Sequence, residues 1–117
     1  MPRARQQGYE VHTIVSPDGN TRASFIPEKG GTGSSLVVNG RELLFLHDYF
    51  WDRQTERIPG GWPFLFPICG RLERGGEAGK YLFDGRMYRM PSHGFGPRTP
   101  WRVVEGGGAD TLVMRLT

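Results

Sequence analysis

His93 and Arg71 are the side chains whose surroundings best suit chemistry. His93 lies in the loop PSHGFGPRTP, beside glycines that would let a ligand approach the backbone, and Arg98 and Trp101 follow it. Arg71 follows the stretch 60–70, whose prolines and aromatics would form a rigid apolar wall. Because the planar guanidinium of arginine offers a fork of donors, Arg71 suits vicinal hydroxyls or a phosphate.

Aromatic faces beside an arginine fork are typical of a sugar site, since a sugar presents apolar C–H patches and hydroxyl edges. Trp62, within the 60–70 stretch, is the aromatic residue that we expect to contact the sugar. The same composition is also typical of a protein interface, in which Trp, Tyr, Phe and Arg are enriched. A binding module that uses the aromatic segment His47 to Gly79, with Trp51 or Trp62 as its anchor, is therefore the alternative interpretation.

Metal and cofactor chemistry find little support in the spacing of the ligands. The histidines and Cys69 are separated by dozens of residues, unlike the close ligand pairs of a metal site, so we expect no metal and no cofactor. Cys69 is expected to be a half-buried structural thiol. Residues 30–33 and 60–61 are glycine-rich but lack the lysine of a phosphate-binding loop, which predicts turns there.

The overall charge and hydropathy exclude several classes of protein. The chain has 117 residues, which predicts a single domain over 1–117. Its 15 Lys and Arg against 12 Asp and Glu give a net charge of +3, but the basic residues are spread along the chain, so no nucleic-acid partner is expected. No apolar run is long enough for a membrane span, and Met1 to Gln7 does not begin a signal peptide, which predicts a cytoplasmic protein.

The elements that must position these loops are predicted to be strands. Asn39-Gly40 and Asp84-Gly85 supply the positive backbone angles that two-residue hairpin turns need, and residues 17–20 and 106–110 mark further turns. No segment keeps the apolar period of an amphipathic helix, so the fold class is predicted to be all-β, an antiparallel β-sandwich with little or no helix. The predicted strands are Tyr9–Val15, Thr21–Ile26, Ser35–Val38, Arg41–Leu46, Lys80–Phe83, Arg86–Met90, Trp101–Glu105 and Thr111–Leu116.

Two irregular stretches, His47 to Gly79 and Pro91 to Pro100, are where we expect the chemistry to lie. Structureless connections as long as the first are uncommon in compact domains and are either functional or disordered. Its aromatic residues argue against disorder. They are Tyr49, Phe50, Trp51, Trp62, Phe64 and Phe66. In the last predicted strand, Leu112, Met114 and Leu116 occupy alternate positions, as a half-buried strand requires.

Four motifs follow one another along nearly the whole chain. They are residues 22–31 (RASFIPEKGG) with 34–44 (SSLVVNGRELL), residues 60–67 (GGWPFLFP) with 70–72 (GRL), residues 81–85 (YLFDG) with Tyr88, and residues 93–95 (HGF) with Pro100-Trp101. In this order and with these gaps, the chain resembles the N-terminal portion of the aldose 1-epimerase (galactose mutarotase-like) family.

The resemblance implies a β-sandwich of the supersandwich type that interconverts the anomers of a hexose or a hexose phosphate at C1. In that family the arginine of the Gly-Arg-Leu motif and the histidine of the His-Gly-Phe motif line the sugar site, which here are Arg71 and His93. Members related to hexose-6-phosphate epimerases place an arginine closely after the His-Gly-Phe motif, and Arg98 is the nearest candidate. The expected partner is therefore a hexose or a hexose phosphate.

The family's catalytic pair does not map onto this chain. Mutarotation needs a base for the anomeric hydroxyl and an acid for the ring oxygen. In the family these are a glutamate near the C-terminus and a histidine on a later strand, and neither position exists here, so no catalytic residue is assigned. We therefore expect an N-terminal fragment or a truncated relative, whose unpaired strand edges would favour a homodimer.

Overall fold

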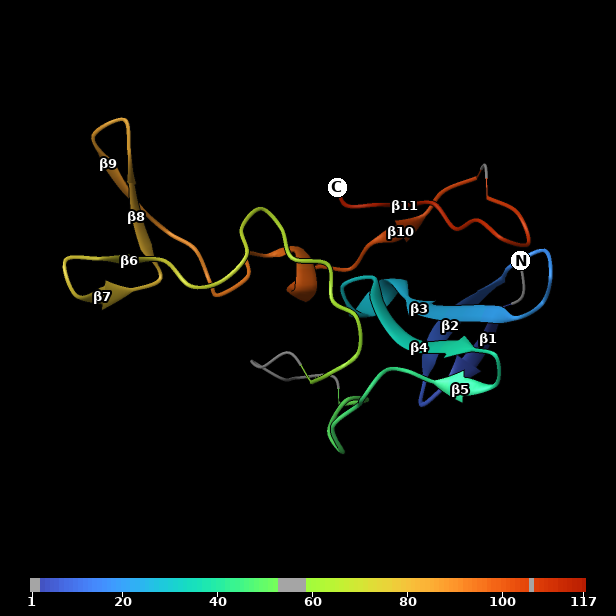
Figure 1. Ribbon diagram of the computed structural model, residues 1–117. Coiled ribbons are helices and arrows are strands. Elements are labelled where there is room, and N and C mark those ends of the chain that lie inside the picture. Colours follow the sequence, from blue (N-terminus) through green and yellow to red (C-terminus); the bar gives the residue numbers. More distant parts are fainter. Residues whose placement is uncertain (1–2, 53–58, 106) are drawn as a thin grey trace.

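The computed structural model describes residues 3–52, 59–105 and 107–117. The prediction of an all-β, antiparallel fold is confirmed, because the only helices in these residues are the short 3-10 turns η1 (Pro27–Lys29) and η2 (Gly96–Arg98). None of them is long and apolar enough to cross a membrane. Figure 1 shows an elongated molecule that has a broad sheet at one end and small hairpins at the other.

A 5-stranded antiparallel sheet, with its strands in chain order, is the largest unit. It consists of β1 (Arg3–Gln6), β2 (Tyr9–Val15), β3 (Thr21–Ile26), β4 (Thr32–Val38) and β5 (Arg41–Glu42). The bounds of β2 and β3 agree with the prediction, whereas β4 begins earlier and β5 ends earlier than expected. Strand β1 was not predicted, because its sequence RARQ is exposed throughout and carries no apolar alternation.

Three two-stranded ribbons make up the rest of the described structure. They are β6 (Glu73–Arg74) with β7 (Glu77–Ala78), β8 (Lys80–Phe83) with β9 (Arg86–Arg89), and β10 (Arg102–Val103) with β11 (Met114–Arg115). The β6–β7 hairpin corrects the expectation that residues 47–79 contain no strand. Its two strands are too short and too polar to show a pattern, and Gly75-Gly76 closes the turn between them. Strands β10 and β11 are also shorter than predicted.

The hairpin turns predicted at Asn39-Gly40 and Asp84-Gly85 are confirmed. The φ angles are 50° and 79° in the first and 50° and 77° in the second. A two-residue turn with positive φ at both central positions matches the twist of the strands that it joins. Gln7-Gly8 forms an unpredicted turn of the same kind, with φ of 53° and 86°.

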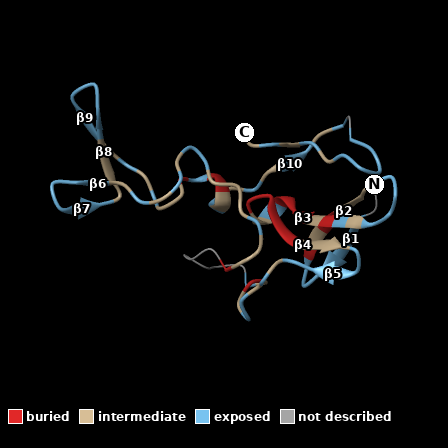
Figure 2. Cartoon of the chain, in the orientation of Figure 1, coloured by how far each residue is buried: buried red, intermediate tan, exposed pale blue. Residues whose placement is uncertain are grey.

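The core lies where the segment that follows β5 packs against the sheet. Tyr9, Val11, Ile26 and Phe50 form one buried cluster, in which Ile26 and Phe50 have no exposed surface. The ring of Trp51 lies 5.0 Å from Phe50 and 6.2 Å from Tyr9. Figure 2 shows this burial concentrated near β2, β3 and β4, while the hairpins β6 to β9 are largely exposed. The aromatic residues of this segment are therefore ordered, as their composition predicted.

Lys29, at the end of η1, joins the same segment to the sheet. Its Nζ donates to the carbonyl of Asp52 over 3.0 Å and lies 5.5 Å from the centre of the Phe50 ring. Desolvation lowers the pKa of Lys29, and the charge of Asp52 acts in the opposite direction. The ammonium thus holds a loop against the core through a backbone hydrogen bond and a contact with the aromatic face.

Candidate functional site

His93 is held by Gly70 through reciprocal hydrogen bonds. The backbone N–H of Gly70 donates to Nδ1 of His93 over 2.9 Å, and the N–H of His93 donates to the carbonyl of Gly70 over 2.7 Å. Because a backbone N–H can only donate, Nδ1 must carry a lone pair, and neutral His93 bears its ring proton on Nε2. The half-buried ring therefore keeps Nε2–H as the donor that remains for a ligand.

The backbone of His93 adopts a conformation that non-glycine residues rarely take. Its φ is 65°, in the left-handed region, where a non-glycine residue carries a strain of about 1–3 kcal/mol. The next residue, Gly94, forms a parallel bridge with Phe66, and the N–H of Phe66 donates to the His93 carbonyl over 3.2 Å. The stretch 60–70 and the loop 91–100, which are separate in sequence, therefore lie side by side.

Arg71 follows Gly70 directly, so its backbone lies next to the contact between Gly70 and His93. Its side chain is exposed and makes no hydrogen bond or ion pair with any residue of the described part of the chain. A guanidinium without a partner among the described residues retains its fork of donors for an oxygen-rich ligand. The structure therefore brings together the segments that carry the predicted site residues Arg71 and His93.

Arg98 is anchored to the loop that carries His93. Its Nη1 donates to the carbonyl of Ser92 over 2.8 Å and to the carbonyl of Gly94 over 3.0 Å. These carbonyls flank His93, so Arg98 stabilises the left-handed turn at that residue. A phosphate-binding role for Arg98 stays a prediction, and this bracing role has no signal in the sequence.

Trp62 lies away from this pair, at the end of the sheet. Its N–H and carbonyl each bond to Gly33 over 2.8 Å, and its ring lies 5.9 Å from that of Phe25. The indole is 45% exposed, and no hydrogen bond or ring contact among the described residues joins it to Arg71 or His93. A role for Trp62 in the same site therefore stays a prediction.

Trp101 supports the histidine loop instead. Its ring lies 5.7 Å from that of Phe64, and its Nε1 donates to the carbonyl of Gly96 over 3.0 Å. The backbone N–H of Gly96 in turn donates to the Phe66 carbonyl over 2.9 Å. Trp101 thus links the apolar stretch to the loop, a role that its place in the sequence after His93 suggests but does not define.

The other candidate metal ligands and nucleophiles do not gather into one site in the part of the chain that the structure describes. Cys69 is exposed, which corrects the expectation of a half-buried thiol, because it lies in the bend before Gly70 and not in a packed strand. His12 is buried in β2, with its Nε2 2.7 Å from a carboxylate oxygen of Glu10. Across residues 3–52, 59–105 and 107–117, no three His, Cys, Asp or Glu side chains gather as metal ligands would.

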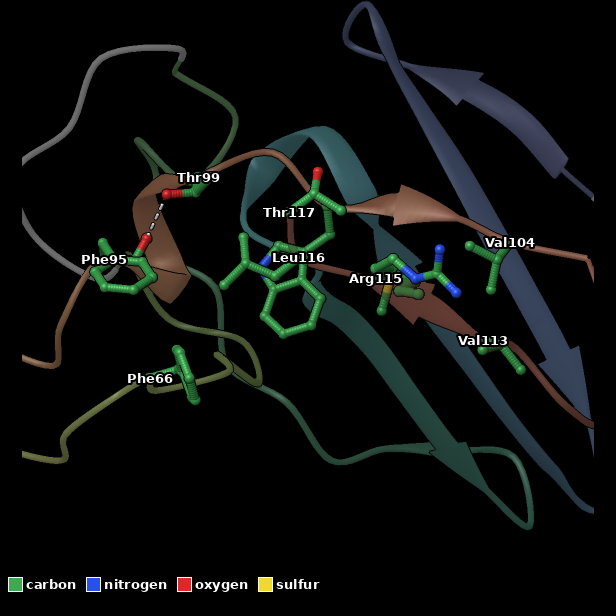
Figure 3. A pocket seen from close by; sticks show the side chains of 10 residues that line it. Phe66, Phe95, Thr99, Val104, Val113, Arg115, Leu116 and Thr117 are labelled. Carbon is green, nitrogen blue, oxygen red and sulfur yellow. Dashed lines mark hydrogen bonds between the residues drawn. The ribbon is translucent and has the colours of Figure 1, made fainter.

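A separate apolar groove, which we call the β11 groove, lies beside the last ribbon and has a volume of about 610 Å³. Figure 3 shows its side chains, which come from the histidine loop at one end and from the C-terminal segment at the other. The lining residues are Phe66, Phe95, Thr99, Trp101, Val104, Val113, Met114, Arg115, Leu116 and Thr117. The alternation of apolar and polar residues over 111–116 is visible in the sequence, but the groove that these residues line could not be predicted from it.

No family model and no curated protein matches the chain. Among solved structures, the chain is similar to the crystal structure of the Slr1438 protein from Synechocystis sp. PCC 6803, with a TM-score of 0.76 and 30% sequence identity. The match covers 91% of this chain and 36% of the Slr1438 chain. The chain therefore spans about a third of the length of that protein.

Proposed function

We propose that this chain is an aldose 1-epimerase-like protein that binds a hexose or a hexose phosphate where Arg71 meets the His93 loop. The observation that carries the proposal is the hydrogen bond from the Gly70 N–H to Nδ1 of His93, 2.9 Å long. This hydrogen bond occupies Nδ1, so the remaining ring donor, Nε2–H, points away from Gly70. The motif resemblance supports the same two residues, Arg71 and His93, as contacts of the sugar.

The two side chains suit complementary parts of such a ligand. The Nε2–H of His93 donates one hydrogen bond to a ring or hydroxyl oxygen, in a direction fixed by the Gly70 contact. The guanidinium of Arg71 donates to two adjacent oxygens, which fits vicinal hydroxyls or a phosphate. The exposed rings of Phe66 and Phe95, 5.7 Å apart, offer apolar surface next to the loop for the C–H face of a sugar.

The proposal concerns binding first, and conversion of anomers second. Exchange at C1 needs a base that takes the proton of the anomeric hydroxyl and an acid that protonates the ring oxygen. We assign neither role to a residue of this chain. Binding without acceleration of anomer exchange would therefore agree with the proposal, and acceleration would show that a working acid and base are present.

NMR titration with glucose, galactose and glucose 6-phosphate tests the binding site. We expect the amides of Gly70, Arg71 and Gly94 to shift, and we expect His93→Ala and Arg71→Ala to weaken binding at least about 10-fold. Arg89→Ala is the matched control, since Arg89 is an exposed arginine at the end of β9 and should leave binding unchanged. In the same samples, the exchange of α and β anomers is measured against a buffer control.

Other outcomes of this titration would overturn the proposal. Absence of shifts with all three sugars would exclude a sugar site in the chain. Sugar binding that survives His93→Ala but is lost in Trp62→Ala would place the site on the aromatic segment of residues 47–79 instead. That result would favour the non-catalytic binding module.

A further inference from the structure

A small cavity with charged side chains lies where β1 and β2 face the start of β10, and we call it the His12 cavity. Its volume is about 370 Å³. Arg3, Glu10 and His12 line it from the sheet, and Glu28 and Arg102 line it from η1 and β10. Both signs of charge therefore surround one space that is large enough for a small molecule.

His12 is a buried histidine with one unpaired ring nitrogen. Its side chain is 5% exposed, and its Nε2 lies 2.7 Å from Oε1 of Glu10. Because an ionised carboxylate only accepts hydrogen bonds, Nε2 carries a proton, and Nδ1 of the neutral ring is an acceptor. Nδ1 has no hydrogen-bond partner among the residues that the structure describes. Since an unpaired buried polar atom is unfavourable, a ligand that donates a hydrogen bond to Nδ1 would be stabilised in the cavity.

Two opposite charges at the His12 cavity also lack a partner. Glu28 and Arg102 are exposed, and neither side chain forms an ion pair or a hydrogen bond within the described part of the chain. Arg102 is moreover the direct cross-strand partner of Arg115, and like charges in this position repel each other. A carboxylate of a ligand would pair with Arg102, and a cationic group of the same ligand would pair with Glu28.

The charges that line the cavity cancel when His12 is neutral. The carboxylate of Glu10 bonds to His12, and its Oε1 also lies 3.7 Å from Nη1 of Arg3. Arg3 and Arg102 together balance Glu10 and Glu28. A ligand with a net charge would disturb this balance, whereas a ligand that carries one charge of each sign preserves it.

Trp101 and its neighbours supply the apolar part of the wall. The backbone N–H of Trp101 donates to the Pro27 carbonyl over 2.8 Å, and its Nε1 donates to the Gly96 carbonyl over 3.0 Å. Both donors of this residue are therefore used, and its ring is held in place. Pro27 and Val103 line the cavity beside Trp101, so this wall suits an aliphatic group.

We propose that the His12 cavity binds a free α-amino acid with an aliphatic side chain. The carboxylate of the ligand pairs with Arg102, and its ammonium group, which has three N–H donors, serves Nδ1 of His12 and the carboxylate of Glu28. A neutral sugar would leave Glu28 and Arg102 without counter-charges, so the charges favour the amino acid. This inference does not rest on the proposed sugar site, since the cavity contains neither Arg71 nor His93.

NMR titration of the full chain with L-leucine provides the test. We expect saturable shifts of the amides of residues 10–12 and 101–103, and a shift of the His12 Nδ1 resonance in long-range ¹H–¹⁵N correlation. Two related ligands each lack one charge. L-leucinamide has no carboxylate and resembles the N-terminus of a polypeptide, whereas N-acetyl-L-leucine has no ammonium group and resembles a C-terminus. Each should bind at least about 10-fold more weakly than L-leucine, because each loses a charge-assisted hydrogen bond.

Matched variants assign the charged contacts. Arg102→Gln should weaken the binding of L-leucine at least about 10-fold. Arg115→Gln is its control, because Arg115 faces Arg102 across the ribbon but lines the β11 groove and not the His12 cavity. Glu28→Gln should also weaken binding, and Glu73→Gln, which changes an exposed glutamate of β6, should not. Amide dispersion of β2 and β3 confirms that each variant is folded.

Several results would overturn the proposal. Absence of saturable shifts with L-leucine would exclude the amino-acid site, and an unchanged His12 Nδ1 resonance would show that the ligand does not reach this ring. Equally tight binding of L-leucinamide would point to the N-terminus of a polypeptide, and equally tight binding of N-acetyl-L-leucine would point to a carboxylate alone. Equal effects of Arg102→Gln and Arg115→Gln would mean that only the overall charge of the ribbon matters.

Discussion

Gly70 and His93 hold each other across two loops that are remote in sequence. The N–H of Gly70 meets Nδ1 of His93 at 2.9 Å, and the N–H of His93 meets the Gly70 carbonyl at 2.7 Å. One residue thus fixes both the backbone and the ring of the other. Since Arg71 follows Gly70, the backbone of Arg71 lies next to this contact.

The first prediction concerns the tautomer of His93. Because Nδ1 accepts from Gly70, we expect neutral His93 to be protonated at Nε2 in more than about eight molecules in ten, which one net hydrogen bond of about 1–1.5 kcal/mol supports. Long-range ¹H–¹⁵N correlation of the imidazole distinguishes the two tautomers directly. A dominant Nδ1–H form would show that the Gly70 contact is absent in solution.

The second prediction concerns Gly94, which lies against the stretch 60–70. A Cβ at this position would lie 2.0 Å from the Phe66 carbonyl oxygen, and its φ is 74°. Gly85, in the β8–β9 turn, has a similar φ of 77° but open space around a Cβ. We expect Gly94→Ala to lower the free energy of unfolding by about 1–3 kcal/mol more than Gly85→Ala, because only the first adds a clash to the strain in φ. Urea denaturation of both variants checks this, and equal losses would mean that the two loops do not pack closely.

Much of the sheet could be predicted because its signals are local. Alternating apolar residues gave β2 and β3, and Asn39-Gly40 gave the hairpin between β4 and β5. Strand β1 escaped prediction because exposed polar residues pair through their backbones alone, which leaves no side-chain pattern. The predicted strand Trp101–Glu105 is shorter because its pairing depends on the distant β11 rather than on its own sequence.

The residue types of the candidate site could be predicted from the sequence, but the contacts between them could not. His93 and Arg71 stand out by their loop surroundings and motifs, but their neighbourhood depends on the Phe66–Gly94 bridge between distant segments. The anchoring of Arg98 to the Ser92 and Gly94 carbonyls follows from the left-handed turn at His93, which no spacing encodes. For Trp62, the sequence did not show that its ring would pack against Phe25, and its role in the site stays a prediction.

The third prediction concerns the anchor of the segment that follows β5. Phe50 has no exposed surface, whereas Phe45, in the same segment, is 70% exposed. Phe50→Ala should therefore destabilise the fold by about 3–5 kcal/mol through lost burial and a cavity, and Phe45→Ala should cost less than about 1 kcal/mol. Thermal unfolding followed by circular dichroism measures both. Similar melting temperatures for the two variants would show that the segment is not part of the core.

The last prediction concerns Glu42, the last residue of β5. One of its carboxylate oxygens accepts from the hydroxyl of Ser35, and the other accepts from the N–H groups of Leu36, Leu43 and Leu44, at 2.8 to 3.2 Å. Desolvation opposes ionisation, but the hydrogen bonds from Ser35 and these backbone groups outweigh it and lower the pKa of Glu42 below its ordinary 4.5.

A carboxylate whose pKa is lower in the folded state stabilises the fold above its unfolded pKa, and this contribution is lost as the pH falls through the folded pKa. We therefore expect Glu42→Gln to cost about 1 kcal/mol at neutral pH, from its weaker acceptance of the backbone N–H groups, and the difference from the parent chain to vanish in acid. Urea denaturation across this pH range measures the difference. Glu73→Gln is the control, because the exposed Glu73 carboxylate makes no hydrogen bond with the residues that the structure describes. A constant difference between parent and Glu42→Gln at every pH would show that Glu42 acts through packing and not through its charge.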